Sequence, residues 1–187
     1  MPLSETADEQ VSRIEPARLE DMSEEMTDLV AEIAAASTAL GRALHPRTAA
    51  RLADLVRIMN TYYSNLIEGH NTRPRDIERA LAGDFDSDEE RRNLQSEAAA
   101  HVYVQAKIDQ MAAEQRLPEP ASCDFILWLH REFYRGSPDR MRQIGKGSHA
   151  FVMEPGLWRS NSGQDVAVGR HVPPASDRVE DFMRYFE

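Results

Sequence analysis

Apolar side chains recur at intervals of three and four residues in the first third of the chain, which is the spacing of one face of an α-helix. One such run covers residues 22–44, and Ser23 stands where an N-cap for the Met26 amide is expected. A second run covers residues 46–67, after a break at a proline and before Gly69, which are typical of a helix start and a helix end. Its apolar stripe consists of Leu52, Leu55, Val56, Met59, Tyr62, Tyr63, Leu66 and Ile67. The pattern predicts two consecutive long helices.

The same spacing predicts four further helices. A short helix follows Pro74, a long one lies within residues 86–116, and a third covers residues 123–134. The last begins near Ser176, which we take as its N-cap, and runs to the end of the sequence. Residues 141–171 are rich in glycine and serine instead, which predicts irregular backbone with one hairpin-like flap. The predicted fold class is therefore mainly α with a small β-hairpin.

Composition and charge narrow the class of protein. The chain has 187 residues, 41% hydrophobic and 29% charged, and its net charge of −10 argues against a chain-wide surface for nucleic acid or anionic membranes. No apolar run reaches the roughly 20 residues that a membrane-spanning helix needs. The acidic residues 1–21 lack the features of a signal peptide, and we expect a disordered tail there. The single cysteine, Cys123, excludes an intramolecular disulfide and favours a cytoplasmic protein.

Residue types that bind metals do not gather in the sequence. His101, His130, His149 and His171 are isolated from one another, and there is no pair of cysteines, so we expect no metal site. Cys123 lies in a predicted helix with nothing beside it that would activate the thiol. We therefore expect a buried, unreactive cysteine.

Glu68 does not suit its place at a helix end. It follows the predicted helix 46–67 and precedes Gly69, where the helix dipole is already negative. A carboxylate there costs about 0.3–1 kcal/mol unless a cation answers it. Taken alone, the residue is most simply a solvated side chain at a helix terminus. The mismatch of charge still makes Glu68 the first candidate for a functional residue.

Several segments, taken in order, resemble the Fic family. SNLIEG, residues 64–69, is similar to the inhibitory-helix motif S/T-x-x-x-E-G/N of class II Fic proteins. ILWLHREFYRG, residues 126–136, resembles the first helix of the Fic core. GLWRSNSGQDVAVGRHVPPASDRVEDFMRYF, residues 156–186, is similar to the family's segment of an arginine, a flap and a double proline before a helix. The resemblance spans residues 47–187 and rests on the ordered set, because each motif alone is short.

The resemblance implies an activity. Fic proteins attach AMP from ATP to hydroxyl side chains of target proteins. Their motif H-P-F-x-D/E-G-N-G-R-x-x-R supplies a histidine base, an acidic residue for magnesium, and amides and arginines for the phosphates, which are parts that phosphate chemistry needs. The 187 residues contain no such motif, and the sequence appears cut just before it. ATP and magnesium are thus implied as cofactors of a longer family member, while we expect no catalytic residue, no cofactor and no AMP transfer from these residues alone.

The resemblance also gives Glu68 a role. In the family, the glutamate of the inhibitory motif pairs with the last arginine of the catalytic motif and blocks productive placement of the ATP γ-phosphate. Ser64 lies four residues earlier, on the same helix face, and could tie the helix to the wall of the nucleotide site. Without that arginine, we expect Glu68 to be solvated or to pair with Arg73 or Arg75. The implied regulatory residues are Ser64, Glu68 and Gly69.

The family's flap holds the target protein by strand addition and presents the target hydroxyl to the base. The best match here is DVAVG, residues 165–169, whose alternating valines suit an exposed strand edge. The implied partner is a protein with a Ser, Thr or Tyr hydroxyl. An ordinary surface hairpin is the alternative interpretation of the same residues. The implied target-binding residues are Val166, Ala167, Val168, Gly169 and His171.

The sequence therefore predicts three regions: an acidic tail at 1–21, a helical region with the inhibitory helix at 22–118, and the beginning of a Fic core with its flap at 119–187. The predicted function is the regulatory and target-clamping part of a Fic-type protein adenylyltransferase. The alternative is a helical protein-interaction module without nucleotide chemistry. We also expect self-association, because the apolar stripe of the last helix lacks neighbours.

Overall fold

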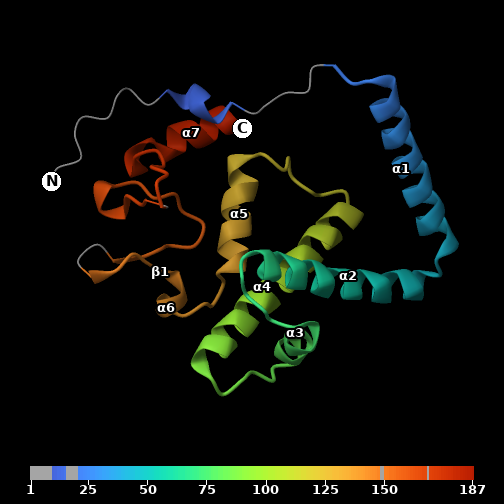
Figure 1. Cartoon of the computed structure of the whole chain (residues 1–187), viewed down its shortest axis with the longest axis horizontal. Coiled ribbons are helices and arrows are strands. Elements are labelled where there is room, and N and C mark those ends of the chain that lie inside the picture. The colour runs from blue at the N-terminus through green and yellow to red at the C-terminus, as the bar shows by residue number, and fades with distance from the viewer. Residues whose placement is uncertain (1–9, 16–20, 148–149, 168) are drawn as a thin grey trace.

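The computed structural model of the chain describes residues 10–15, 21–147, 150–167 and 169–187, which are mainly helical (Figure 1). The α-helices are α1 (Glu24–Ala43), α2 (Pro46–Ile67), α3 (Pro74–Leu81), α4 (Glu89–Ala113), α5 (Cys123–Phe133), α6 (Asp139–Arg142) and α7 (Val179–Phe186). The short 3₁₀ helices are η1 (Val11–Ile14), η3 (Ser162–Gln164) and η4 (Ser176–Arg178). Strands β1 (Gln143–Ile144) and β2 (Phe151–Val152) form an antiparallel pair. The predicted fold class, mainly α with a small hairpin, is confirmed.

The core lies where α2 and α3 pack against α4. Its buried cluster consists of Ile58 from α2, Ile77 from α3, and Ala98 and Val102 from α4, with the ring of Tyr62 packed against it. A polar contact joins the same helices, because Gln105 Nε2 of α4 donates a hydrogen bond to Thr61 Oγ1 of α2 at 3.1 Å. Thr61 is fully buried, so this hydrogen bond satisfies a hydroxyl that water cannot reach. The core thus fixes α2 on the long helix α4.

The most apolar face of α2 is not the face that packs on α4. The buried residues of α2 are Ile58, Thr61 and Asn65. The predicted apolar stripe lies mostly on the outside, where Leu52, Leu55, Val56, Tyr63, Leu66 and Ile67 are exposed. Exposed apolar surface of this extent is unusual unless another chain or segment covers it. The second helix therefore has an uncovered apolar face.

Side chains cap the first turns of several helices, one of them as predicted. The Met26 amide donates to Ser23 Oγ at 3.2 Å, as expected from the sequence. At the start of α4, the Arg91 amide donates to Asp88 Oδ1 at 3.0 Å. Each cap satisfies an amide that has no partner inside its helix, which fixes where the helix begins.

A buried ion pair joins α5 to α4. The Glu132 side chain is 3% exposed, and its Oε2 lies 2.6 Å from Lys107 Nζ. The Arg135 guanidinium also pairs with this carboxylate. Burial alone would raise the pKa of Glu132, but the hydrogen bonds and charges of Lys107 and Arg135 outweigh it and hold the pKa below its ordinary value. A buried carboxylate stays charged only when cations compensate it, and here Lys107 and Arg135 do so.

The hairpin lies within the predicted range of residues 141–171, but not at DVAVG. Gln143 pairs with Val152 and Ile144 with Phe151, whereas residues 165–167 and Gly169 form no strand. The expectation of a hairpin at DVAVG is wrong for these described residues, and Val168 lies outside the part that the structure describes. Two valines are too few to specify a paired strand, and hydrogen bonds from side chains, described below, hold this segment instead.

Ser176 does not cap the last helix as predicted. It begins η4, which leads directly into α7, and no side chain caps the first residue of either helix. The Ser176 side chain is buried and its hydroxyl accepts a hydrogen bond from Arg159 Nη1 at 2.8 Å. The hydroxyl is thus engaged with a distant arginine rather than with the helix amides that it was expected to satisfy.

Helix α1 lies to one side of the packed helices α2 to α5 (Figure 1). None of its residues is buried. In the part of the chain that the structure describes, no helix has both the length and the apolar character needed to cross a membrane.

Candidate functional site

The C-terminal end of α2 places Glu68 at the helix boundary. The His70 amide donates to the Asn65 carbonyl at 2.7 Å, and the Gly69 amide donates to the Leu66 carbonyl at 3.1 Å. These two hydrogen bonds define a Schellman motif, in which the residue after the cap adopts a left-handed conformation. Gly69 does so, with φ of +84°. The glycine is therefore required by the turn, and the turn fixes the backbone of Glu68.

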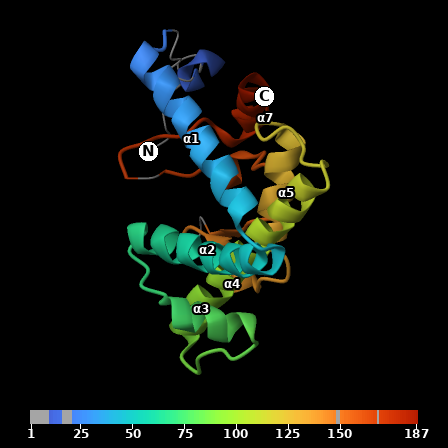
Figure 2. The same ribbon diagram turned by 90° about the vertical axis from the view of Figure 1, so that its right-hand side faces the viewer.

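The Glu68 carboxylate faces solvent without a cation. Within the described residues its side chain forms no hydrogen bond and no ion pair, and neither Arg73 nor Arg75 pairs with it. Ser64, one turn earlier, is exposed as well. Figure 2 shows this end of α2 on the opposite side of the molecule from α5. Of the two surroundings expected for Glu68, the structure has the solvated one.

Exposed apolar side chains precede Glu68 in the last turns of α2. Ile67 is 84% exposed, and Tyr63 and Leu66 are exposed too. These residues belong to the uncovered face of α2 described above. The end of the helix therefore combines an exposed carboxylate with exposed apolar surface.

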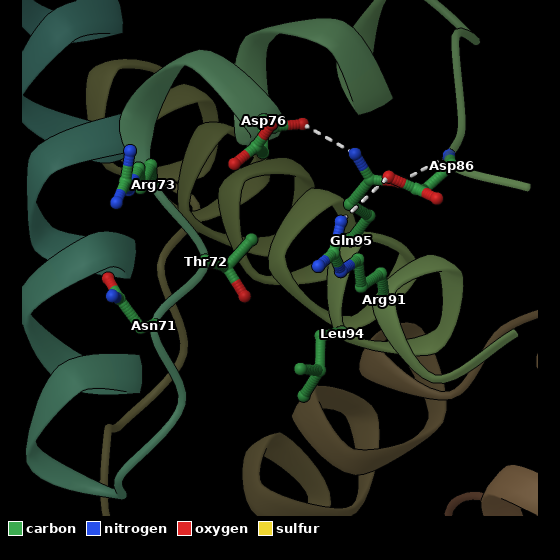
Figure 3. Close-up of a pocket in the computed structure, with 8 residues that line it drawn as sticks. All are labelled: Asn71, Thr72, Arg73, Asp76, Asp86, Arg91, Leu94 and Gln95. Atoms are coloured by element: carbon green, nitrogen blue, oxygen red, sulfur yellow. Dashed lines mark hydrogen bonds and ion pairs between the residues drawn. The ribbon is translucent and has the colours of Figure 1, made fainter. Parts of the chain in front are cut away.

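The loop after Glu68 forms one wall of a polar cavity of about 400 Å³ (Figure 3). The lining residues are Asn71, Thr72, Arg73, Asp76, Asp86, Arg91, Leu94 and Gln95. The Gln95 amide is satisfied, since Oε1 accepts from the Asp86 amide at 2.7 Å and Nε2 donates to the Asp76 carbonyl at 3.4 Å. The buried Thr72 hydroxyl has no partner among the described residues. Sequence reasoning missed this cavity, because its walls come from three separate segments.

A second set of contacts positions the predicted flap. The Gly156 amide donates to His130 Nδ1 of α5 at 2.8 Å. A side chain at Gly156 would lie 2.9 Å from Arg131 Cβ, so glycine alone permits this approach. Burial in the same region lowers the pKa of His130, which keeps its Nδ1 free to accept the hydrogen bond.

Arg159, Asp165 and Ser176 close the base of the flap segment. The Ser176 amide donates to Asp165 Oδ1 at 2.8 Å, and Arg159 donates to both the Ser176 hydroxyl and the Pro174 carbonyl. Hydrogen bonds from the Ser176 side chain and backbone, with the nearby Arg159 charge, lower the pKa of Asp165. The residues between these anchors, including most of the predicted target-binding set, form an outward loop.

The predicted target-binding residues differ in exposure. Ala167, Gly169 and His171 are exposed, Val166 is half-buried, and Val168 lies outside the described residues. Gly169 has a left-handed conformation with φ of +61°. The described members of this set thus lie in one loop, and no described hydrogen bond or ion pair joins them to Glu68.

The described residues contain no group of three or more histidine, cysteine, aspartate or glutamate side chains placed to hold a metal ion. Burial raises the pKa of the Cys123 thiol, with the Glu187 carboxylate adding to the effect. This shift fits an unreactive cysteine, although the side chain is only half-buried. Comparison with family models, curated proteins and solved structures found no match to this chain.

Proposed function

We propose that this chain is the N-terminal regulatory and target-clamping part of a Fic-type protein adenylyltransferase. The proposal rests on the ordered resemblance of three segments between residues 47 and 187. The observation that carries it is the carboxylate of Glu68, which is exposed at the end of α2 and pairs with no cation of the described residues. A carboxylate that forms no hydrogen bond or ion pair with the described residues is available for a contact with another segment.

The inhibitory role follows from the chemistry of arginine. A carboxylate and a phosphate both bind the guanidinium group through paired, charge-assisted hydrogen bonds. A glutamate that holds the last arginine of the catalytic motif therefore excludes a nucleotide phosphate from it and repels the anion as well. The uncovered apolar face beside Glu68, with Tyr63, Leu66 and Ile67, offers the surface on which the arginine-bearing segment would pack.

The target-clamping role belongs to the loop between Arg159 and Ser176. Its base is fixed by side chains, while Ala167 and Gly169 leave their backbone groups accessible at the surface. An accessible backbone edge can add a strand of a target protein, and the target contributes a Ser, Thr or Tyr hydroxyl. The proposed setting is the cytoplasm, in keeping with a single cysteine that forms no disulfide within the chain.

AMP transfer tests the inhibitory role directly. The chain is joined at Glu187 to a segment with the motif H-P-F-x-D/E-G-N-G-R-x-x-R, taken from its own gene where the codons encode it and grafted otherwise. With ATP and magnesium, AMP incorporation measured by intact mass should rise about ten- to hundredfold in Glu68→Gln. This range corresponds to loss of one charge-assisted pair worth roughly 1.5–3 kcal/mol.

Glu78→Gln is the matched control, because Glu78 is an exposed glutamate in α3 beyond the loop that follows Glu68. It should leave incorporation unchanged. The inhibitory role is refuted if Glu68→Gln and Glu78→Gln behave alike while the joined protein binds ATP.

A helical protein-interaction module is the second candidate function. The observation that favours it is the uncovered apolar face of α1, where Leu29, Val30 and Ile33 are all exposed. This candidate predicts that the joined protein binds no ATP, whatever residue stands at position 68. Titration calorimetry with ATP therefore separates the two functions.

A further inference from the structure

Helix α1 carries a regular apolar seam that no element of the described chain buries. Counting from Met26, apolar residues recur at alternating steps of three and four. The seam consists of Met26, Leu29, Ile33, Ala36, Leu40 and Ala43. Its large members are between 42% and 68% exposed. Steps of three and four sustained over the length of a helix are the heptad pattern of a helix that packs along another helix.

An isolated helix of this length has little stability in water. Single helices of fewer than about 12–15 residues are marginal even with favourable sequences, and longer ones still gain most stability from packing an apolar face. Helix α1 has 20 residues, and none of them is buried. Its side-chain contacts that are described are local, such as Ser23 capping Met26 and Thr38 bonding the Ala34 carbonyl. The missing stabilisation must come from a partner.

We propose that the partner is α1 of a second copy of this chain, packed in the antiparallel direction. In an antiparallel pair, each a position of one helix faces a d position of the other. This register places Met26 opposite Ala43 of the second copy, Ile33 opposite Ala36, and Leu29 opposite Leu40. Two of the three kinds of layer therefore join a large side chain to a small one, which allows close packing without voids.

The distribution of charged residues along α1 also favours the antiparallel direction. The acidic residues of α1 all lie in its N-terminal half: Glu24, Glu25, Asp28 and Glu32. The cation in its last turn is Arg42. An antiparallel pair places Arg42 of each copy beside the acidic half of the other, on the side of the seam where Glu25 and Asp28 also lie. A parallel pair would instead bring the two acidic halves together with no cation between them, which is unfavourable.

The first experiment measures mass by sedimentation over a dilution series of the whole chain. Wild type should approach twice 21.2 kDa at high concentration, and Ile33→Asp should remain at the monomer mass throughout. Ala31→Asp is the matched control, because it adds the same charge on the outer face of α1 and should leave the dimer intact. A wild-type monomer at every concentration would overturn the proposal, and so would a dimer that Ile33→Asp leaves unchanged, since α7 or α2 would then form it.

A size exchange along the seam tests the direction of packing and does not depend on introducing a charge. Ala36→Leu should weaken the dimer at least tenfold, because the antiparallel layer would then join isoleucine to leucine where space exists for alanine. Adding Ile33→Ala to this variant restores a large residue opposite a small one and should recover the dimer. In a parallel pair Ala36 faces Ala36, so Ala36→Leu would strengthen association, and that result would overturn the antiparallel arrangement.

Discussion

The carboxylates of Glu68 and Glu132 lie at the C-terminal ends of two helices, in opposite surroundings. Both meet the negative end of a helix dipole, which disfavours their charge. Glu132 is 3% exposed and is answered by Lys107 and Arg135. Glu68 is exposed, and the described residues supply no cation for it. The unfavourable interaction with the helix dipole is therefore compensated by cations at Glu132 and by solvent at Glu68.

The difference separates a structural carboxylate from an available one. A buried carboxylate must be compensated within the fold, or the fold pays its full desolvation cost. An exposed carboxylate is compensated by water and needs no partner for the chain to fold. Glu68 is thus not required by the architecture of these residues, and this leaves it free for the regulatory contact proposed above.

The largest expected effect is on the buried site. Glu132→Gln keeps the size of the side chain but removes the charge that Lys107 and Arg135 answer. We expect the free energy of unfolding to fall by about 1.5–3 kcal/mol, the value typical of a hydrogen bond to a charged group. Urea unfolding followed by circular dichroism measures it, with Glu78→Gln as an exposed control expected to stay within about 0.5 kcal/mol. Equal free energies of unfolding for Glu132→Gln and Glu78→Gln would show that the Glu132 ion pair does not stabilise the fold.

The dependence of stability on pH should also show the contribution of the Glu132 carboxylate. The pKa of Glu132 is lower in the folded chain than its ordinary value, as is that of Asp165, so both favour folding above the unfolded pKa near 4. This stabilisation is lost as the pH falls through the folded pKa. The melting temperature should therefore drop as the pH falls below the unfolded pKa near 4, and less steeply in Glu132→Gln. An unchanged pH profile in that variant would contradict the pairing of Glu132.

The turn after Glu68 should be more sensitive than Glu68 itself. Gly69 has φ of +84°, and a side chain there costs about 1–2 kcal/mol. We expect Gly69→Ala to lower the free energy of unfolding by that amount in urea titrations. Gly41→Ala is the control, because Gly41 lies within α1 and should gain stability from the substitution. An unchanged free energy of unfolding in Gly69→Ala would mean that residue 69 does not adopt the left-handed conformation.

The smallest effect is expected at Glu68. Replacing it with glutamine removes an unfavourable interaction with the helix dipole, so the free energy of unfolding should rise by no more than about 0.3–1 kcal/mol. The gain should shrink in high salt, because exposed charges are screened. A loss of stability in Glu68→Gln would show that a contact within the chain holds the carboxylate.

The sequence allowed the longer helices to be predicted, because regular apolar spacing and local caps such as Ser23 are encoded within a few residues, whereas the four-residue helix α6 was not predicted. It did not predict the buried ion pair of Glu132, because nothing near this glutamate in the sequence indicates that a lysine 25 positions away will pair with it. Ser176 was assigned to a local cap although its hydroxyl binds Arg159 across 17 residues. The place of Glu68 was predictable because its turn is local, whereas its partner is not encoded nearby.

ATP affinity tests the central claim most directly, in the chain joined to the catalytic motif. The claim is that Glu68 occupies an arginine which a nucleotide phosphate would otherwise bind. Glu68→Gln should therefore tighten ATP binding by about tenfold in calorimetry while the last arginine of the motif is present, and should change nothing once that arginine is replaced by methionine. Equal gains with and without the arginine, or no gain in either protein, would contradict the account.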